Sequence, residues 1–122
     1  MTVWGRVAAR VTLWRWLLAV AMLALLTLSL MPAALSPSTG WDKGNHALGF
    51  AVLALLAHWA WPTHTPRTLL ALLGYGALIE ILQSLTPDRL AEWSDLWADS
   101  TGLLIGVVLA SMVERLVATR SS

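Results

Sequence analysis

Three pairs of polar residues in this chain have the spacing of one helix face. Residues three or four positions apart project from the same side of an α-helix, so each pair would present its side chains together. Carboxylates beside an imidazole can exchange protons with a substrate, hold a cation or pair with a basic ligand group. The pairs are Asp42 and His46, Glu80 and Gln83, and Asp95 and Asp99.

Two basic residues, Lys43 and Arg89, accompany these pairs. The guanidinium of Arg89 is a planar, bidentate donor that suits phosphate or carboxylate groups. These residues can also have purely structural roles. Asp42 and Lys43 can form a polar helix start, and Arg89 can pair with Glu80 or Asp95.

A divalent cation is another possible ligand for the acids and His46. However, two acids at a spacing of four are common by chance, and no Gly-rich phosphate loop, Ser-x-x-Lys or His-Glu-x-x-His pattern occurs. Cysteine is absent, which excludes thiolate ligands. We therefore predict no metal and no cofactor. His58 and His64 lie apart from the pairs and are interpreted as surface residues.

The elements that carry these residues are predicted to be membrane-spanning helices. Of the 122 residues, 57% are apolar and 12% are charged, which leaves too little polar surface for a soluble domain. A helix needs roughly 20 apolar residues to cross a bilayer, with a range of about 17–25. We expect an all-α, polytopic membrane protein, with one domain over 1–122 built as a bundle of four transmembrane helices. The predicted spans are about 16–35, 43–61, 68–85 and 96–117.

Two of these spans have alternatives. The second is long enough only if its helix begins near Asp42. The first can instead be a signal peptide, although its apolar run is longer than the usual 7–15 residues of such a segment.

The distribution of basic residues predicts the orientation. Lys and Arg favour cytoplasmic flanks, and six of them lie on the side of the termini against two on the other. Both termini are therefore expected in the cytoplasm, and the polar pairs outside it. A net charge of +1 gives no electrostatic footprint for nucleic acid.

Glu80 and Asp99 lie inside spans, where a charge costs on the order of 3 kcal/mol at mid-bilayer, so they should face the bundle interior. The small residues Gly102 and Gly106, four positions apart, predict close packing of the fourth helix and offer a face for a homo-oligomer.

Three motifs between residues 41 and 106 resemble, in order and spacing, those of the VanZ-like membrane protein family. One departure is Asp99, where the family pattern usually has Asn. The motifs are Asp42-Lys43-x-x-His46 with Phe50, Glu80-x-x-Gln83 with Pro87-x-Arg89, and Ser94-Asp95-x-x-x-Asp99-x-x-Gly102.

The resemblance implies a role at the bacterial cell envelope, in the cytoplasmic membrane. The namesake of the family is associated with low-level resistance to the glycopeptide antibiotic teicoplanin. The resemblance does not indicate a biochemical reaction.

We predict that the polar end forms an extracytoplasmic cup that binds or modulates a lipid or a lipid-linked cell-wall component, with Arg89 and Lys43 taking an anionic group. Membrane lipids would then be the partners. One alternative is a membrane-embedded enzyme that acts on such a lipid, with His46 as general base. Another is a small transporter or proton relay, which rests on Glu80 and Asp99 within spans. The predicted residues of this polar cup are Asp42, Lys43, His46, Glu80, Gln83, Arg89, Asp95 and Asp99.

Overall fold

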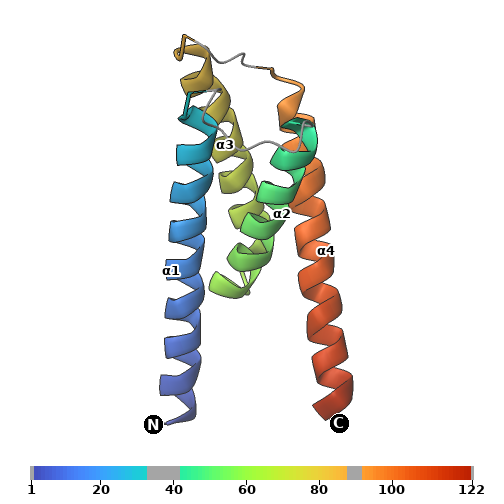
Figure 1. The fold of residues 1–122 in the computed structure, drawn as a ribbon. Helices are drawn as coiled ribbons and strands as arrows, with labels where there is room; N and C mark the ends of the chain where they lie inside the picture. The colour runs from blue at the N-terminus through green and yellow to red at the C-terminus, as the bar shows by residue number, and fades with distance from the viewer. Residues whose placement is uncertain (1, 33–41, 88–91, 122) are drawn as a thin grey trace.

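The structure is a computed structural model, and it describes residues 2–32, 42–87 and 92–121, with only the backbone of residues 4, 42 and 121. No strand occurs in these ranges, so the predicted all-α class is confirmed. The four helices are α1 (Val3–Leu30), α2 (Asp42–Ala60), α3 (Thr65–Ser84) and α4 (Asp95–Ser121), as Figure 1 shows.

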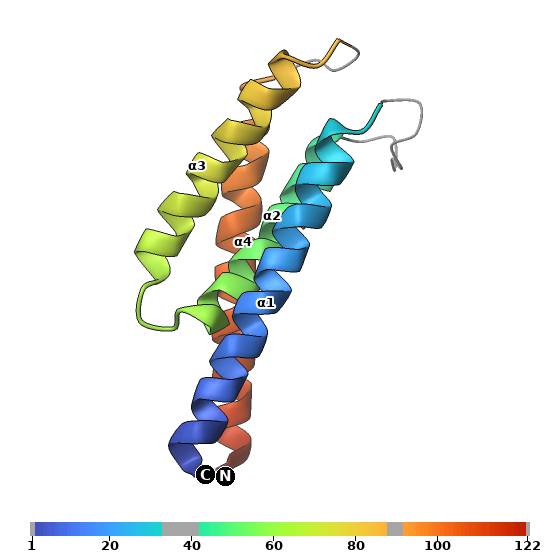
Figure 2. The ribbon, with the colours of Figure 1, turned by 90° about the vertical axis from the view of Figure 1, so that its left-hand side faces the viewer.

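The helices run alternately up and down, so their ends gather at two ends of the bundle (Figure 1). The C-terminal ends of α1 and α3 lie with the N-terminal ends of α2 and α4. The two chain termini lie at the opposite end, where α1 and α4 extend beyond the connection between α2 and α3 (Figure 2). α2 contacts α1, α3 and α4, with its most extensive contact to α4. The helix that carries His46 is therefore the centre of the bundle.

Three helices are long and apolar enough to cross a membrane: α1 over Gly5–Leu30, α3 over Thr65–Ser84 and α4 over Asp95–Arg120. The chain is thus an all-α membrane protein. α2 does not meet the same criterion because its first turn is polar, and its role as a fourth span stays a prediction. One side of its apolar part packs against the neighbouring helices, since Phe50 and Leu53 are buried, whereas Leu48 and Val52 on another side are exposed.

The helix ends follow local chemistry. The side chain of Thr2 caps α1 by accepting a hydrogen bond from the backbone N–H of Gly5 at 3.0 Å. α1 ends at Leu30, earlier than the predicted 35, because Met31 precedes a proline and is extended. Pro66 stands in the first turn of α3, where its missing N–H removes no helical hydrogen bond.

Close packing of α2 on α4 depends on two glycines of α4. A Cβ added at Gly102 would collide with the backbone carbonyl of Ala47, and one at Gly106 with that of Ala51. Both glycines are buried against α2. The face expected to be available for a homo-oligomer is therefore occupied within the chain.

Candidate functional site

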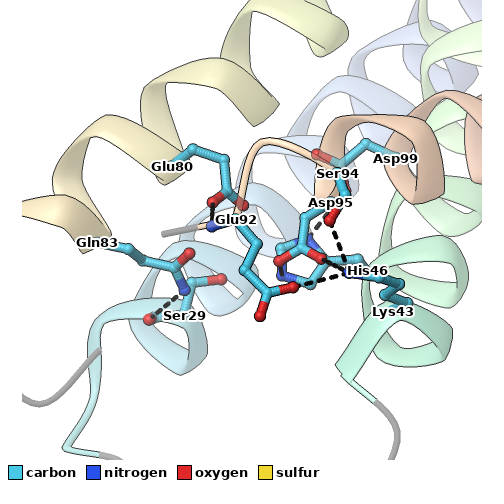
Figure 3. A network of polar contacts seen from close by, with 9 residues as sticks. All are labelled: Ser29, Lys43, His46, Glu80, Gln83, Glu92, Ser94, Asp95 and Asp99. Carbon is cyan, nitrogen blue, oxygen red and sulfur yellow. Dashed lines mark hydrogen bonds and ion pairs between the residues drawn. The ribbon is translucent and has the colours of Figure 1, made fainter. Parts of the chain in front are cut away.

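Six residues of the predicted polar cup lie at the end of the bundle opposite the termini (Figures 1 and 3). The first turns of α2 and α4 and the last turns of α3 bring them there. The side chain of Asp42, and Arg89, lie outside the described residues. The six are Lys43, His46, Glu80, Gln83, Asp95 and Asp99.

His46 on α2 faces two acids of α4. Its Nδ1 lies 2.9 Å from Oδ1 of Asp99, and its Nε2 lies 3.7 Å from Oδ2 of Asp95. The shorter distance is that of a hydrogen bond, and the longer one is not. Asp95 and Asp99 are one helical turn apart, so a single imidazole contacts both.

Glu80 on α3 completes this group and is fully buried. Its Oε2 accepts a hydrogen bond of 3.0 Å from the backbone N–H of Glu92, while its Oε1 has no partner among the described residues. One ligand atom each of His46, Glu80 and Asp95 lies within 4.8 Å of the others. We call His46, Glu80, Asp95 and Asp99 the His46 cluster.

Gly76, one turn before Glu80, provides room for this cluster. A Cβ at position 76 would lie 2.5 Å from Oδ2 of Asp99 and 3.2 Å from Cζ of Phe50. Oδ2 of Asp99 is itself buried without a hydrogen-bond partner among the described residues. The absence of a side chain at Gly76 therefore lets α3 pack against the buried carboxylate of Asp99.

Lys43 forms the outer rim of the site together with Glu92. The ammonium group lies 2.9 Å from Oε2 of Glu92, 2.9 Å from Oγ of Ser94 and 3.0 Å from Oδ1 of Asp95 (Figure 3). These contacts use all three of its donors, so an anionic ligand would have to displace one. The hydrogen bond from Lys43, and then its positive charge, lower the pKa of Glu92. The predicted cup omitted Glu92. The only signal in the sequence for its role is that it lies near the other charged residues of the connection before α4.

Gln83 belongs to a separate contact. Its Nε2 donates a hydrogen bond of 2.9 Å to the backbone carbonyl of Ser29, so it faces α1 and not His46 (Figure 3). Tyr75, on the same helix, also donates its hydroxyl to a carbonyl of α1, that of Met22. The two side chains attach α3 to α1.

The prediction that His58 is a surface residue is wrong. Its side chain is only 12% exposed, and its Nε2 lies 3.0 Å from Oε1 of Glu114 on α4. Its Nδ1 lies 3.1 Å from the hydroxyl of Thr65, because the short turn after α2 returns the chain to this position. His64 is exposed, as expected.

The comparison with protein families decides the identity of the chain. The family model described as VanZ/LLP1 matches residues 7–114. The chain belongs to the VanZ/LLP1 family. This confirms the resemblance noted from the three motifs. The match covers the whole His46 cluster and the rim. No curated protein and no solved structure matches the chain.

This VanZ/LLP1 chain also has an open apolar groove of about 770 Å³ between α3 and α4. Residues of both helices line it, together with Trp93 just before α4; Trp93 and Trp97 have 57% and 78% of their surface exposed. Its lining includes Leu70, Leu73, Ala77, Trp93, Leu96 and Trp97.

The arrangement in this VanZ/LLP1 member offers two kinds of chemistry. The buried His46 cluster can hold a proton or a cation between its carboxylates. The exposed rim of Lys43 and Glu92 carries both charge signs, and the groove is apolar. The two surfaces adjoin in the chain, because Glu92 of the rim is followed by Trp93 of the groove.

Proposed function

We propose that the protein binds a lipid, or a lipid-linked cell-wall component, at the bacterial cytoplasmic membrane. An acyl or prenyl chain would lie in the groove between α3 and α4, with the headgroup at the rim. One observation carries the proposal: the segment 92–93 belongs to both surfaces. Glu92 contacts Lys43 at the rim, and Trp93 lines the groove.

The groove supports a lipid chain as its occupant. α3 and α4 are both apolar enough to cross a membrane, and in a bilayer the groove between them would then open toward hydrocarbon. Its volume of about 770 Å³ is in the range of small-molecule sites, about 300–1,000 Å³. Tryptophans are enriched at the headgroup level of bilayers, which suits Trp93 and Trp97 at the polar end of the groove.

The rim favours a headgroup that is zwitterionic or rich in hydroxyls. Lys43 and Glu92 are about half exposed, with 43% and 55% of their side-chain surface accessible. Because Lys43 already contacts Glu92, Ser94 and Asp95, a bare anion gains little there. A headgroup that offers both an acceptor and a donor could engage Lys43 and Glu92 together.

The proposed orientation places the rim outside the cytoplasm and both termini inside. It is supported by the excess of Arg at the end of the termini, under the positive-inside rule. At that side of the bundle, Arg15 lies 4.6 Å from the ring centroid of Trp61 and donates to the carbonyl of Ala60. The proposed link to glycopeptide resistance rests on the family alone.

Lipid co-purification tests this proposal. Native mass spectrometry of the gently solubilised protein should detect a bound lipid, and Ala77→Trp, which fills the groove, should remove most of it. Ala71→Trp is the matched control, since Ala71 is exposed on the same helix and does not line the groove. If the wild type carries no lipid, or if Ala77→Trp retains it, the proposal fails.

A membrane-embedded enzyme is the second candidate, and the contact between His46 and Asp99 favours it. A carboxylate that holds Nδ1 leaves Nε2 available as a general base. Lipid pools of cells carrying wild type, a deletion or His46→Gln should then differ, with the variant resembling the deletion. Identical pools in all three would exclude catalysis on lipids.

A further inference from the structure

The His46 cluster has an excess of negative groups in a buried place. Glu80 and Asp99 are fully buried and Asp95 is 6% exposed. Together with Glu92, these acids make four carboxylates, which face one ammonium, that of Lys43, and one imidazole within the described part of the chain. A buried charge without a partner is costly, so these carboxylates require a proton or a further cation.

Lys43 neutralises only the outer side of this group. Its ammonium contacts Oδ1 of Asp95 and the carboxylate of Glu92, at the exposed rim. Oδ2 of Asp95 points instead toward His46, and Oε1 of Glu80 has no hydrogen-bond partner among the described residues. The unneutralised carboxylate oxygens therefore surround His46: Oδ2 of Asp95 and Oε1 of Glu80 lie on one side, and Oδ2 of Asp99, which also has no hydrogen-bond partner among the described residues, belongs to the carboxylate on the other.

The distance between His46 and Asp95 fits a bridging metal ion. Nε2 and Oδ2 are 3.7 Å apart, which is too long for a hydrogen bond. Zinc lies about 2.0–2.2 Å from nitrogen and oxygen ligands, so two ligands of one ion can be separated by up to roughly 4.3 Å. The ligand atom of Glu80 lies within 4.8 Å of both. Three ligands of one ion lie roughly 3.4–3.6 Å apart, so a movement of the Glu80 side chain by up to about 1.4 Å brings all three into coordination range.

In such a site, Asp99 would not bind the metal itself but would hydrogen-bond the histidine that does. A histidine that binds a metal through one ring nitrogen usually donates the other N–H to a carboxylate, which fixes the tautomer and the direction of the ring. Nδ1 of His46 lies 2.9 Å from Oδ1 of Asp99, and with an ionised Asp99 it is Nδ1 that donates the hydrogen bond. This contact directs the lone pair of Nε2 toward Asp95. When the proton is on Nδ1, the lone pair of Nε2 faces the carboxylate of Asp95 with no proton between the two groups.

From these contacts we infer that His46, Glu80 and Asp95 bind a divalent first-row transition-metal ion, with Asp99 positioning the imidazole. One nitrogen and two carboxylates form a mixed donor set that suits Zn²⁺ or Mn²⁺, whereas Ca²⁺ prefers six to eight oxygen ligands. The inference goes beyond lipid binding and does not depend on it, because the rim and the groove do not include His46 or Glu80.

The test uses the full chain, purified in detergent, stripped with a chelator and dialysed against Zn²⁺ or Mn²⁺ alone. We expect one retained equivalent of metal by elemental analysis. Bound Mn²⁺ should show the hyperfine coupling of an imidazole nitrogen in pulsed electron paramagnetic resonance. Asp99→Asn should weaken binding by about 10–100-fold, the usual cost of losing such an outer partner.

Two variants without the ligand group and one matched control complete the experiment. His46→Gln and Glu80→Gln should lose stoichiometric binding. His58→Gln should keep it, since His58 also contacts a carboxylate but lies at the other end of α2. If the wild type retains neither metal, if bound Mn²⁺ shows no nitrogen coupling, or if His46→Gln binds as the wild type does, the inference is wrong. The nitrogen coupling tests the site in the wild type itself, so it does not require that the variants fold.

Discussion

Nδ1 of His46 lies 2.9 Å from Oδ1 of Asp99, which joins α2 to α4 across 53 residues of sequence. The two helices form the most extensive contact of the bundle, and the acid is fully buried. The contact therefore fixes the direction of the imidazole and also connects the central helix to its main neighbour.

Replacing Asp99 by alanine should destabilise the protein. Hydrogen bonds to charged groups contribute about 1.5–3 kcal/mol, and the imidazole would lose its buried acceptor. We expect Asp99→Ala to lower the free energy of unfolding by about that amount in denaturant titrations of the detergent-solubilised protein. Asp99→Asn keeps an oxygen acceptor and should cost clearly less. Equal stability of wild type and Asp99→Ala would contradict a stabilising role.

Alanine at Gly102 should disturb the contact between α2 and α4. The new Cβ would meet the carbonyl of Ala47, which belongs to rigid helix backbone. Overpacking of this kind costs about 1–3 kcal/mol, and we expect a loss of stability in that range. Gly74→Ala is the control, because a Cβ there meets nothing within 4 Å. It should be neutral or slightly stabilising, since alanine favours a helix over glycine by about 1 kcal/mol. A thermal shift that is the same for both variants would argue against the close approach.

Removing the amide of Gln83 should loosen the end of α1. The carbonyl of Ser29 lies in the last turn of α1, where carbonyl groups have no N–H donor within the helix. Gln83 donates a hydrogen bond to it at 2.9 Å. We expect Gln83→Leu to cost about 0.5–1.5 kcal/mol and to speed hydrogen exchange in the last turns of α1. Exchange in α4 serves as the internal reference. Faster exchange in both helices alike would indicate general destabilisation instead.

The sequence predicted the helical class and the faces of the helices that carry the polar residues. That His46, Asp95 and Asp99 lie on the inward faces of their helices could be anticipated from their spacing, but the contact between the imidazole and the two acids could not. How each helix is rotated toward its neighbours could not be read from one sequence. Gln83 therefore contacts α1, although its spacing from Glu80 suggested a common target.

The remaining misses have similar causes. Glu92 lies on a connection, where no periodicity predicts its position. His58 and Glu114 are 56 residues apart, and only the packing of α2 on α4 brings them together.

The contact between Lys43 and Glu92 should make part of the stability depend on pH. The hydrogen bond and the charge of Lys43 lower the pKa of Glu92 below its ordinary 4.5 in the folded protein. The contribution is therefore fully present above pH 4.5 and is lost as the pH falls through the lower, folded-state pKa. Lys43→Met removes both causes, so the pKa of Glu92 should rise. Carboxyl-carbon NMR of the glutamate-labelled protein in micelles measures the titration directly, with Glu92→Gln to assign the signal. If the Glu92 midpoint is the same with Lys43 and with methionine, the rim contact does not form in solution.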